Sequence, residues 1–218
     1  MISKKKAVAY LDVMENLFPD AHCELNHENA FELTLAVLMS AQTTDKMVNV
    51  LTDSLFKKYK TPEDYLNVSL EQLQQDVKTI GLYRMKAKNI QALCRILIDK
   101  HGGTVPASHE ELVKLPGVGR KTANVVMSVA FDWPAIAVDT HVERIAKRLD
   151  MAKKSANVLE VEERLMYLFP KERWSKAHHV MIFFGRYHCL ARNPKCETCP
   201  LLSECKFGTR LLKNKEKI

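Results

Sequence analysis

LPGVGRKTANVVMSVAFDWPAIAVDT, residues 115–140, is the stretch around which the rest of the chain is organised. It opens with Pro116, Gly117 and Gly119, and two cations and a mostly apolar run follow. Glycine permits a positive φ and lets a ligand approach the backbone closely. A helix that begins directly after such a turn presents unpaired N–H groups and a partial positive charge, which suit a phosphate. The stretch therefore predicts a phosphate-binding turn with Lys121 beside it.

Two side chains of this stretch, Lys121 and Asp139, carry candidate chemistry. A lysine beside such a turn is either a phosphate ligand or, after losing its proton, an amine nucleophile. Ordinary lysines are almost fully protonated at neutral pH, so the second role requires a site that excludes water. Asp139 would accept a proton or stabilise positive charge on a sugar ring, unless it is simply a helix cap. Because Thr140 and Glu143 already fit a capping box, we expect the Asp139 side chain to project elsewhere.

Four of the six cysteines form a candidate metal site with the spacing C-x6-C-x2-C-x5-C. A four-cysteine zinc site usually has two closely spaced pairs, whereas this stretch has one. Four thiolates on unequal loops suit an iron–sulfur cluster better. The spacing therefore favours a cluster over zinc, and a stretch without metal is the remaining alternative. The four residues are Cys189, Cys196, Cys199 and Cys205.

Composition and charge suggest a protein with a polyanionic partner and argue against a membrane protein. The net charge of +7 over 218 residues suggests a polyanionic partner, although a merely basic globular protein is an equal alternative. No apolar run approaches the roughly 20 residues that span a bilayer, and no signal-like region is evident. We therefore expect no membrane association and a cytoplasmic, nucleoid-associated protein. Basic residues that surround the cysteines form either a solvated surface or a phosphate-contacting face: Arg186, Arg192, Lys195, Lys206 and Arg210.

The apolar residues recur at helical spacing along nearly the whole chain, and sustained alternation is absent. The sequence therefore predicts an all-α fold. Capping boxes are expected at Ser69 with Gln72 and at Ser108 with Glu111, and the charged tail 213–218 is expected to fray. Expected helices cover residues 4–18, 31–39, 48–59, 69–77, 87–97, 157–168 and 174–187, with further helices after Ser108, Gly119 and Asp139.

Three motifs together resemble the endonuclease III family of the helix-hairpin-helix superfamily of DNA glycosylases. They are residues 115–119 with Lys121, residues 138–141 (VDTH), and the four-cysteine stretch. The resemblance covers nearly the whole chain, including residues 40–42 (SAQ) and 80–83 (IGLY). The resemblance is to this family rather than to two related classes. Adenine-mismatch glycosylases lack a lysine at the position of Lys121, and oxoguanine glycosylases lack the four-cysteine stretch.

The resemblance implies a bifunctional enzyme that removes oxidised pyrimidines from duplex DNA and then nicks the strand. Lys121 corresponds to the family's nucleophile, which attacks the sugar C1′, forms a Schiff base and cleaves 3′ to the abasic site by β-elimination. Asp139 corresponds to the assisting carboxylate. The partner is double-stranded DNA that carries damaged bases or abasic sites, and the damaged nucleotide must leave the stack.

The resemblance also assigns roles to other residues. Gln42 and Leu82 correspond to residues that fill the vacated space and wedge the duplex, and the hairpin residues Gly117, Val118, Gly119 and Arg120 to the phosphate anchor. Asp45, Thr140 and His141 are expected to support the site. The four cysteines correspond to ligands of a structural [4Fe-4S] cluster.

The family's architecture is two helical domains with a cleft between them, in a monomer. The implied cluster domain is discontinuous, residues 1–22 plus 134–218, and residues 23–133 form a six-helix domain that contains the hairpin. The alternative from another class is a non-catalytic, structure-specific DNA-binding module with a four-cysteine metal site.

Overall fold

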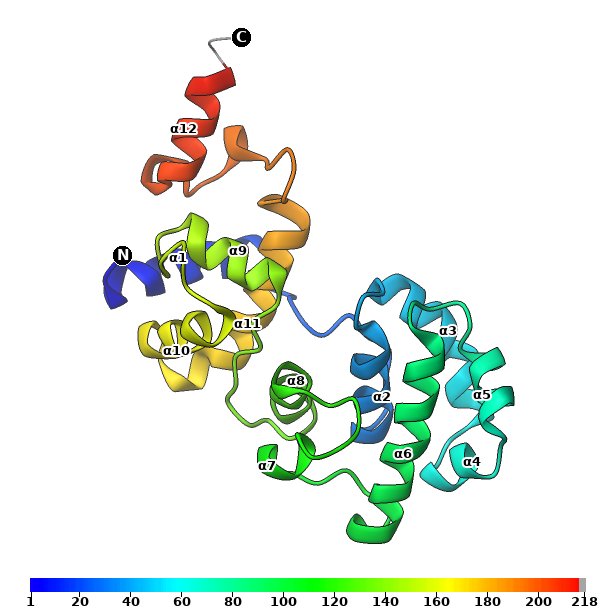
Figure 1. The fold of residues 1–218 in the computed structure, drawn as a ribbon. Helices are drawn as coiled ribbons and strands as arrows, with labels where there is room; N and C mark the ends of the chain where they lie inside the picture. The colour runs from blue at the N-terminus through cyan, green and yellow to red at the C-terminus, as the bar shows by residue number, and fades with distance from the viewer. Residues whose placement is uncertain (216–218) are drawn as a thin grey trace. The chain divides into compact units, whose positions relative to one another are not determined.

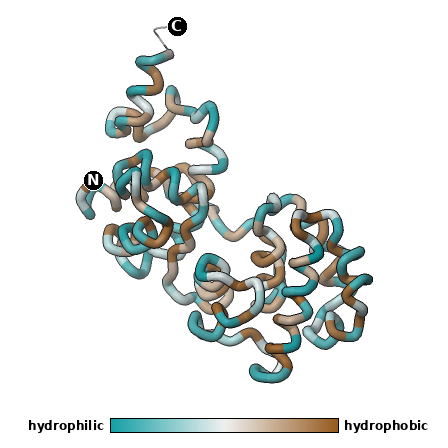
Figure 2. The backbone as a smooth tube through the Cα atoms, in the orientation of Figure 1, coloured by the Kyte–Doolittle hydropathy of each residue, from teal (hydrophilic) through white to brown (hydrophobic). Residues whose placement is uncertain are grey.

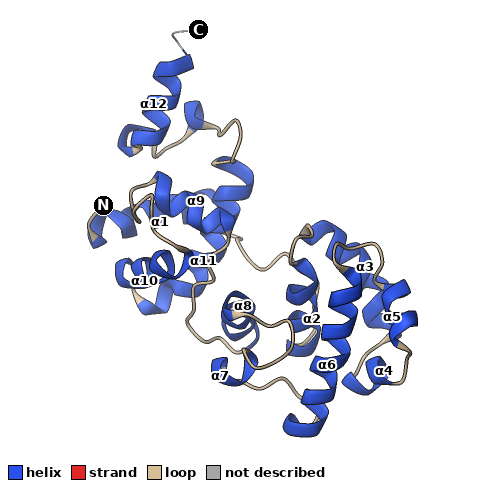
Figure 3. Ribbon diagram, viewed as in Figure 1, coloured by secondary structure: helices blue, strands red, loops and turns tan. Residues whose placement is uncertain are grey.

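The computed structural model describes residues 1–215, and these residues form helices and turns without any strand (Figure 3). The all-α prediction is therefore confirmed. Within the same residues no helix combines the length and the apolar character needed to cross a membrane.

The chain divides into two compact units (Figure 1). The central unit is Glu24–Trp133. The discontinuous unit combines Met1–Cys23 with the chain from Pro134 onward, so that its N-terminal segment packs with the C-terminal half.

The central unit is built on α2 (Ala30–Ser40), in which every residue from Phe31 to Met39 is buried. Such a helix is apolar on all sides because neighbours cover all of its faces. Figure 2 shows hydrophobic residues along it. The helices that pack against it are α3 (Asp45–Lys58), α6 (Tyr83–His101) and α8 (Arg120–Ala130); α4 (Pro62–Leu66) and α5 (Leu70–Asp76) pack on α6, and α7 (His109–Leu112) packs on α8.

The discontinuous unit has its own hydrophobic core, which four helices build. Each helix contributes at least one buried residue: Leu11, Ile145, Leu165 and Val180. These helices are α1 (Lys4–Leu17), α9 (Thr140–Arg148), α10 (Val158–Leu168) and α11 (Trp174–Phe183). The cysteines lie in or directly after three short turns: the π-helical turn η2 (Phe184–His188) and the 3-10 turns η3 (Cys196–Thr198) and η4 (Leu202–Glu204). Helix α12 (Lys206–Lys215) follows the last cysteine, and a further 3-10 turn, η1 (Lys171–Arg173), precedes α11.

The expected helix 174–187 differs from the structure because it changes to a π-helical turn at Phe184. Gly185 lies in this turn and faces α9. A Cβ added there would lie 2.9 Å from Cβ of His141 and 3.2 Å from Nη2 of Arg144, so only glycine permits this approach of η2 to α9.

Several helix ends were predictable and others were not. Ser69 and Ser108 cap α5 and α7, accepting from the N–H groups of Gln72 and Glu111, which is the serine half of each expected capping box. Helices α4 and α12 were not expected. Lys213 to Lys215 belong to α12, and the rest of the charged tail lies outside the described residues.

Candidate functional site

The hairpin between α7 and α8 is held by its buried apolar residues and by one glycine. The N–H of Val118 donates to the carbonyl of Leu115 at 3.0 Å, and both side chains are buried. Gly117 has φ +79°, and a Cβ added to it would lie 2.8 Å from Cδ1 of Leu38 and 3.0 Å from Nδ2 of Asn89. Glycine is therefore required here both by the left-handed backbone and by contact with α2 and α6.

Gly119 is a different case. It precedes α8 as its N-cap with extended backbone, φ −91° and ψ 177°, and it supplies no side-chain cap. A Cβ added to it would meet nothing within 4 Å. The described protein therefore does not itself require glycine at this position, and open space lies in front of the start of α8.

Lys121 is exposed on the first turn of α8, next to the exposed Arg120. The opposite face of α8 is buried from Ala123 to Ser128, where it packs against α2. A positive charge at the start of a helix is disfavoured by the helix dipole, so an anion bound there would relieve two cations and the dipole together.

Gln42 and Leu82 both have left-handed backbone, with φ 56° and 57°. Leu82 is 51% exposed and precedes α6 as its N-cap; Gln42 is exposed after α2. Positive φ is an outlier for a bulky residue such as leucine and stores strain of about 1–3 kcal/mol. The two turns are neighbours, because a Cβ added to Gly81 would lie 3.4 Å from the carbonyl oxygen of Gln42. The half-buried Asp45 begins α3 nearby in the chain.

Lys86 is a site residue that sequence reasoning missed. It is only 4% exposed, and its Nζ donates to the carbonyls of Met39 and Ala41 and to Oγ1 of Thr43. A signal was present, because Lys86 shares the helical face of Ile90, Leu93 and Leu97, where an apolar residue is expected.

Asp139 does not follow the prediction. It is itself the N-cap of α9: its Oδ1 accepts from the N–H groups of His141 and Val142, both at 2.8 Å. The expected Thr140–Glu143 capping box is therefore wrong. The helix begins at Thr140, so the residue before it occupies the capping position, and an aspartate fills that position better than a threonine.

The second oxygen of Asp139 faces a ring. Oδ2 lies 3.1 Å from Nδ1 of His141, and the side chains of Asp139 and His141 are 12% and 30% exposed. The preceding residues 135–138 are buried and lie outside any helix, which anchors Asp139 from the N-terminal side. Thr140 is exposed on the first turn of α9. Asp139, Thr140 and His141 belong to the discontinuous unit, whereas Lys121, Gln42 and Leu82 belong to the central unit.

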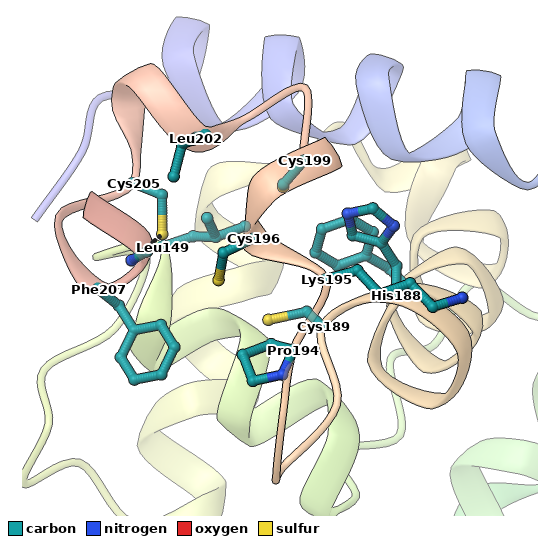
Figure 4. Close-up of a pocket in the computed structure, with 12 residues that line it drawn as sticks. Leu149, His188, Cys189, Pro194, Lys195, Cys196, Cys199, Leu202, Cys205 and Phe207 are labelled. Carbon is teal, nitrogen blue, oxygen red and sulfur yellow. Dashed lines mark hydrogen bonds between the residues drawn. The ribbon is translucent and has the colours of Figure 1, made fainter. Parts of the chain in front are cut away.

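The four predicted cysteines line one pocket together with Leu149, Pro194, Leu202 and Phe207 (Figure 4). Figure 4 shows the sulfur atoms of Cys189, Cys196 and Cys205 turned toward a common space. All six cysteines lie in the described part of the chain, and no disulfide joins any of them.

The pocket suits a group larger than one ion. Four thiolates around a single zinc would converge to about 3.8 Å from one another, given Zn–S bonds of about 2.3 Å. Across residues 1–215, no three His, Cys, Asp or Glu side chains are arranged to hold one metal ion. Gly208 lies against this space: a Cβ there would lie 3.1 Å from Cδ1 of Leu202, a tight contact, and in ordinary contact, at 3.6 and 3.7 Å, with Sγ of Cys196 and Cys205. The residues therefore fit an iron–sulfur cluster.

Arg148 of α9 secures the first part of the cysteine stretch. Its guanidinium donates to Sγ of Cys189 at 3.3 Å and to the carbonyls of Leu190 at 2.7 Å and Ala191 at 3.0 Å. It also lies 4.1 Å from the ring centroid of Phe207. Burial raises the pKa of the Cys199 thiol, so a thiolate at Cys199 requires a positive partner such as bound iron. Outside this cluster of contacts, Arg192, Lys195, Lys206 and Arg210 are exposed and Arg186 is half-buried.

Residues 35–171 match the model of the HhH-GPD superfamily of base excision DNA repair proteins. Residues 189–205 match the iron–sulfur binding domain of endonuclease III, which confirms the predicted [4Fe-4S] cofactor.

Among characterised relatives, endonuclease III of Bacillus subtilis is 60% identical over 210 residues, 96% of each chain. Endonuclease III of Escherichia coli K12 is 44% identical over 210 residues, 96% of this chain and 99% of that protein. A solved non-covalent endonuclease III–DNA complex has a TM-score of 0.96 at 59% identity, covering 98% of this chain and all of that chain. A trapped endonuclease III–DNA covalent intermediate has a TM-score of 0.95, also at 59% identity, covering 97% of this chain and all of that one. The chain belongs to the endonuclease III family of DNA glycosylases and abasic-site lyases, within the HhH-GPD superfamily of base excision repair proteins.

Proposed function

We propose that this enzyme excises oxidised pyrimidines from duplex DNA and cleaves the strand 3′ to the abasic site, with Lys121 as nucleophile. The observation that carries the proposal is the exposure of Lys121 on the first turn of α8, two residues after Gly119, where an added Cβ would meet nothing within 4 Å. The similar solved structure described as a trapped covalent intermediate with DNA supports covalent chemistry in this family.

The proposed reaction begins with attack of the Lys121 amine on C1′ of the damaged nucleotide. The C1′–N bond breaks, and the base leaves with the electron pair and takes up a proton. The sugar ring then opens as O4′ leaves C1′, which gives a protonated imine between C1′ and Nζ. Loss of a C2′ proton drives β-elimination: the C3′–O bond breaks and the 3′ phosphate departs. Water hydrolyses the imine and returns the free amine.

Asp139 assists this reaction in the proposal. Oδ1 accepts from two backbone N–H groups, and Oδ2 lies 3.1 Å from Nδ1 of the His141 ring. Hydrogen bonds donated to a carboxylate favour its charged form, which suits stabilisation of positive charge on the sugar better than proton acceptance. We therefore assign Asp139 mainly the electrostatic role and His141 the task of fixing Oδ2.

DNA would be held by the hairpin and opened by the two left-handed turns. The amides from Gly117 to Arg120 at the start of α8 are suited to one phosphate. The net charge of +7 favours a polyanion in general. Gln42 and Leu82, exposed on neighbouring turns, would enter the space that the flipped nucleotide leaves. Asp45 would support the Gln42 turn from α3.

The four cysteines hold the cluster, which when bound cross-links residues 189–205 through four iron–thiolate bonds. Arg148 and Phe207 fix the same stretch by their own contacts, described above. The exposed basic residues Arg192 and Lys195 are thereby presented on an ordered loop, where they would contact DNA phosphates.

The experiment that tests the proposal is a panel of duplexes that carry one lesion each, with strand cleavage as the readout. Oxidised pyrimidines should be released and the strand nicked on the 3′ side, whereas undamaged duplex should stay intact. Binding of damaged duplex without any base release or nicking would instead favour the non-catalytic DNA-binding module.

A further inference from the structure

Lys86 is a buried lysine for which the proposed chemistry has no use. Its Nζ donates to the carbonyl oxygens of Met39 at 2.8 Å and Ala41 at 2.7 Å, and to Oγ1 of Thr43 at 3.0 Å. All three acceptors are neutral, and burial lowers the pKa of Lys86. A buried cation without a carboxylate is costly unless each of its donors is satisfied. The contacts of Lys86 thus commit it fully to the turn at residues 39–43.

That turn has an unusual residue in its third position. The N–H of Thr43 donates to the carbonyl of Ser40 at 3.1 Å, Ala41 has φ −57° and ψ 117°, and Gln42 has φ 56°. These values describe a type II β-turn, which requires a positive φ at its third residue and therefore usually carries glycine there. Here Gln42 occupies the place of glycine.

Types I and II differ in the direction of the central peptide, which in this turn joins Ala41 to Gln42. Its carbonyl oxygen is the atom that Lys86 binds at 2.7 Å. In a type I turn this carbonyl would point to the opposite face, and Gln42 would return to an ordinary negative φ. The Lys86 contact therefore opposes the relaxation that Gln42 would otherwise undergo.

We propose that Lys86 is a positioning residue that holds the Ala41–Gln42 peptide in its type II orientation and thereby aims the Gln42 side chain outward. This inference rests on the proposed function of Gln42 as the residue that fills the vacated space in the duplex. A wedge residue on a turn that flips freely would lose entropy on each binding event, whereas a turn fixed in advance does not.

Lys86 also contacts the turn of Leu82, the second residue that would enter the duplex. The backbone N–H of Lys86 donates to the carbonyl of Leu82 at 3.0 Å, which is the first hydrogen bond of α6. Lys86 thus binds the Leu82 turn through its backbone and the Gln42 turn through its side chain. This fixes the spacing of the two residues that would enter the duplex.

A crystal structure of Lys86→Met tests the local claim. We expect the Ala41 carbonyl to reverse and Gln42 to adopt a negative φ; a type II turn that persists in this variant would overturn the proposal. If Lys86→Met does not fold, Lys86→Gln removes the charge and shortens the side chain, and the same comparison applies to it.

A double-mutant cycle with Gln42→Ala separates positioning from a general structural role. On damaged duplex, Lys86→Met should lower kcat/KM by about tenfold to a hundredfold, as for other misplaced contact groups. In the Gln42→Ala background the same change should cost less than about twofold, because interacting residues are not additive. Lys100→Met, the same substitution at the exposed far end of α6, is the matched control and should stay near wild type.

Two results would contradict the inference: losses that multiply in the double variant, or equal losses for Lys86→Met and Lys100→Met. Failure of the proposed function looks different. In that case Gln42→Ala alone leaves cleavage of damaged duplex unchanged, while the crystal structure still decides whether Lys86 sets the turn.

Discussion

Asp139 and His141 contact each other twice: Oδ1 of Asp139 accepts from the backbone N–H of His141 at 2.8 Å, and Oδ2 lies 3.1 Å from its ring Nδ1. One carboxylate therefore caps α9 and forms part of the proposed site. Its two oxygens divide these tasks, so substitutions can separate them.

Asp139→Asn should abolish most turnover with little effect on stability. Asparagine caps a helix as well as aspartate does, so Oδ1 can keep its two backbone hydrogen bonds, but the negative charge is lost. Asp139→Ala should lose turnover and also about 1 kcal/mol of stability, because the cap is gone. Single-turnover rates, DNA affinity and thermal denaturation of both variants measure these effects.

The two variants also decide whether Asp139 acts on the reaction at all. If Asp139→Asn lowers the affinity for damaged duplex by the same factor as it lowers the turnover rate, the carboxylate serves binding or folding. If Asp139→Asn keeps full turnover, the electrostatic role assigned to Asp139 is wrong.

Gly117→Ala and Gly119→Ala form a matched pair on the hairpin. Gly117→Ala should destabilise the protein by roughly 2–4 kcal/mol, because the new Cβ combines left-handed strain with overlap of Leu38 and Asn89. Gly119→Ala should cost less than about 1 kcal/mol, since its Cβ enters open space and its backbone is extended. Thermal denaturation compares the two.

Gly119→Ala, although it has little effect on stability, should reduce the affinity of the protein for DNA. With a phosphate in front of α8, the added methyl group would weaken binding of duplex in a folded protein. Unchanged affinity of Gly119→Ala would place the phosphate elsewhere.

His179 on α11 should make stability fall on acidification. Burial, with His22 and Lys176 nearby, lowers the pKa of His179 from 6.5 to about 4. The unfolded state thus binds a proton at a higher pH than the folded state does, so the contribution of His179 is complete above pH 6.5 and is lost as the pH falls toward 4. Its size is about 3 kcal/mol. Thermal denaturation between pH 7 and pH 4 should show a shallower loss for His179→Gln than for wild type, and equal slopes would exclude this origin.

Purified protein should contain iron and sulfide in equal amounts, with four of each per chain and no stoichiometric zinc. Replacing Cys199 by alanine should lower the iron content and make residues 189–205 accessible to proteolysis, because Arg148 and Phe207 contact only part of this stretch. Elemental analysis and limited proteolysis measure both effects. Leu190→Ala, a change next to a ligand rather than at one, is the control and should retain iron.

The fold class and the cysteine site follow from the sequence because both depend on local pattern. Helical periodicity persists through α6 and α10, a mostly apolar run marks the buried α2, and the spacing of the four cysteines limits the metal groups that they can hold. The short helices α4 and α12 were missed, although Thr61 followed by Pro62 is a recognisable helix start.

The predictions fail where two residues both suit one capping position, or where contacts between distant segments determine the local structure. Thr140 and Asp139 both suit the start of α9, and only the structure shows that the helix begins one residue after Asp139. Gly185 lies in a π-helical turn that α9 approaches too closely for a Cβ, which no local signal reveals. Lys86 departs from an otherwise apolar face, yet the acceptors that make this tolerable come from a distant turn.

The central claim is that Lys121 forms a covalent bond with the sugar, and borohydride trapping tests it most directly. Wild-type enzyme mixed with abasic duplex DNA and borohydride should give a stable protein–DNA adduct, and peptide mapping should place the DNA on Lys121. Lys114→Ala, which removes an exposed lysine on the other side of the hairpin, should trap like wild type. Lys121→Ala should give no adduct; an adduct of undiminished yield in that variant would contradict the account.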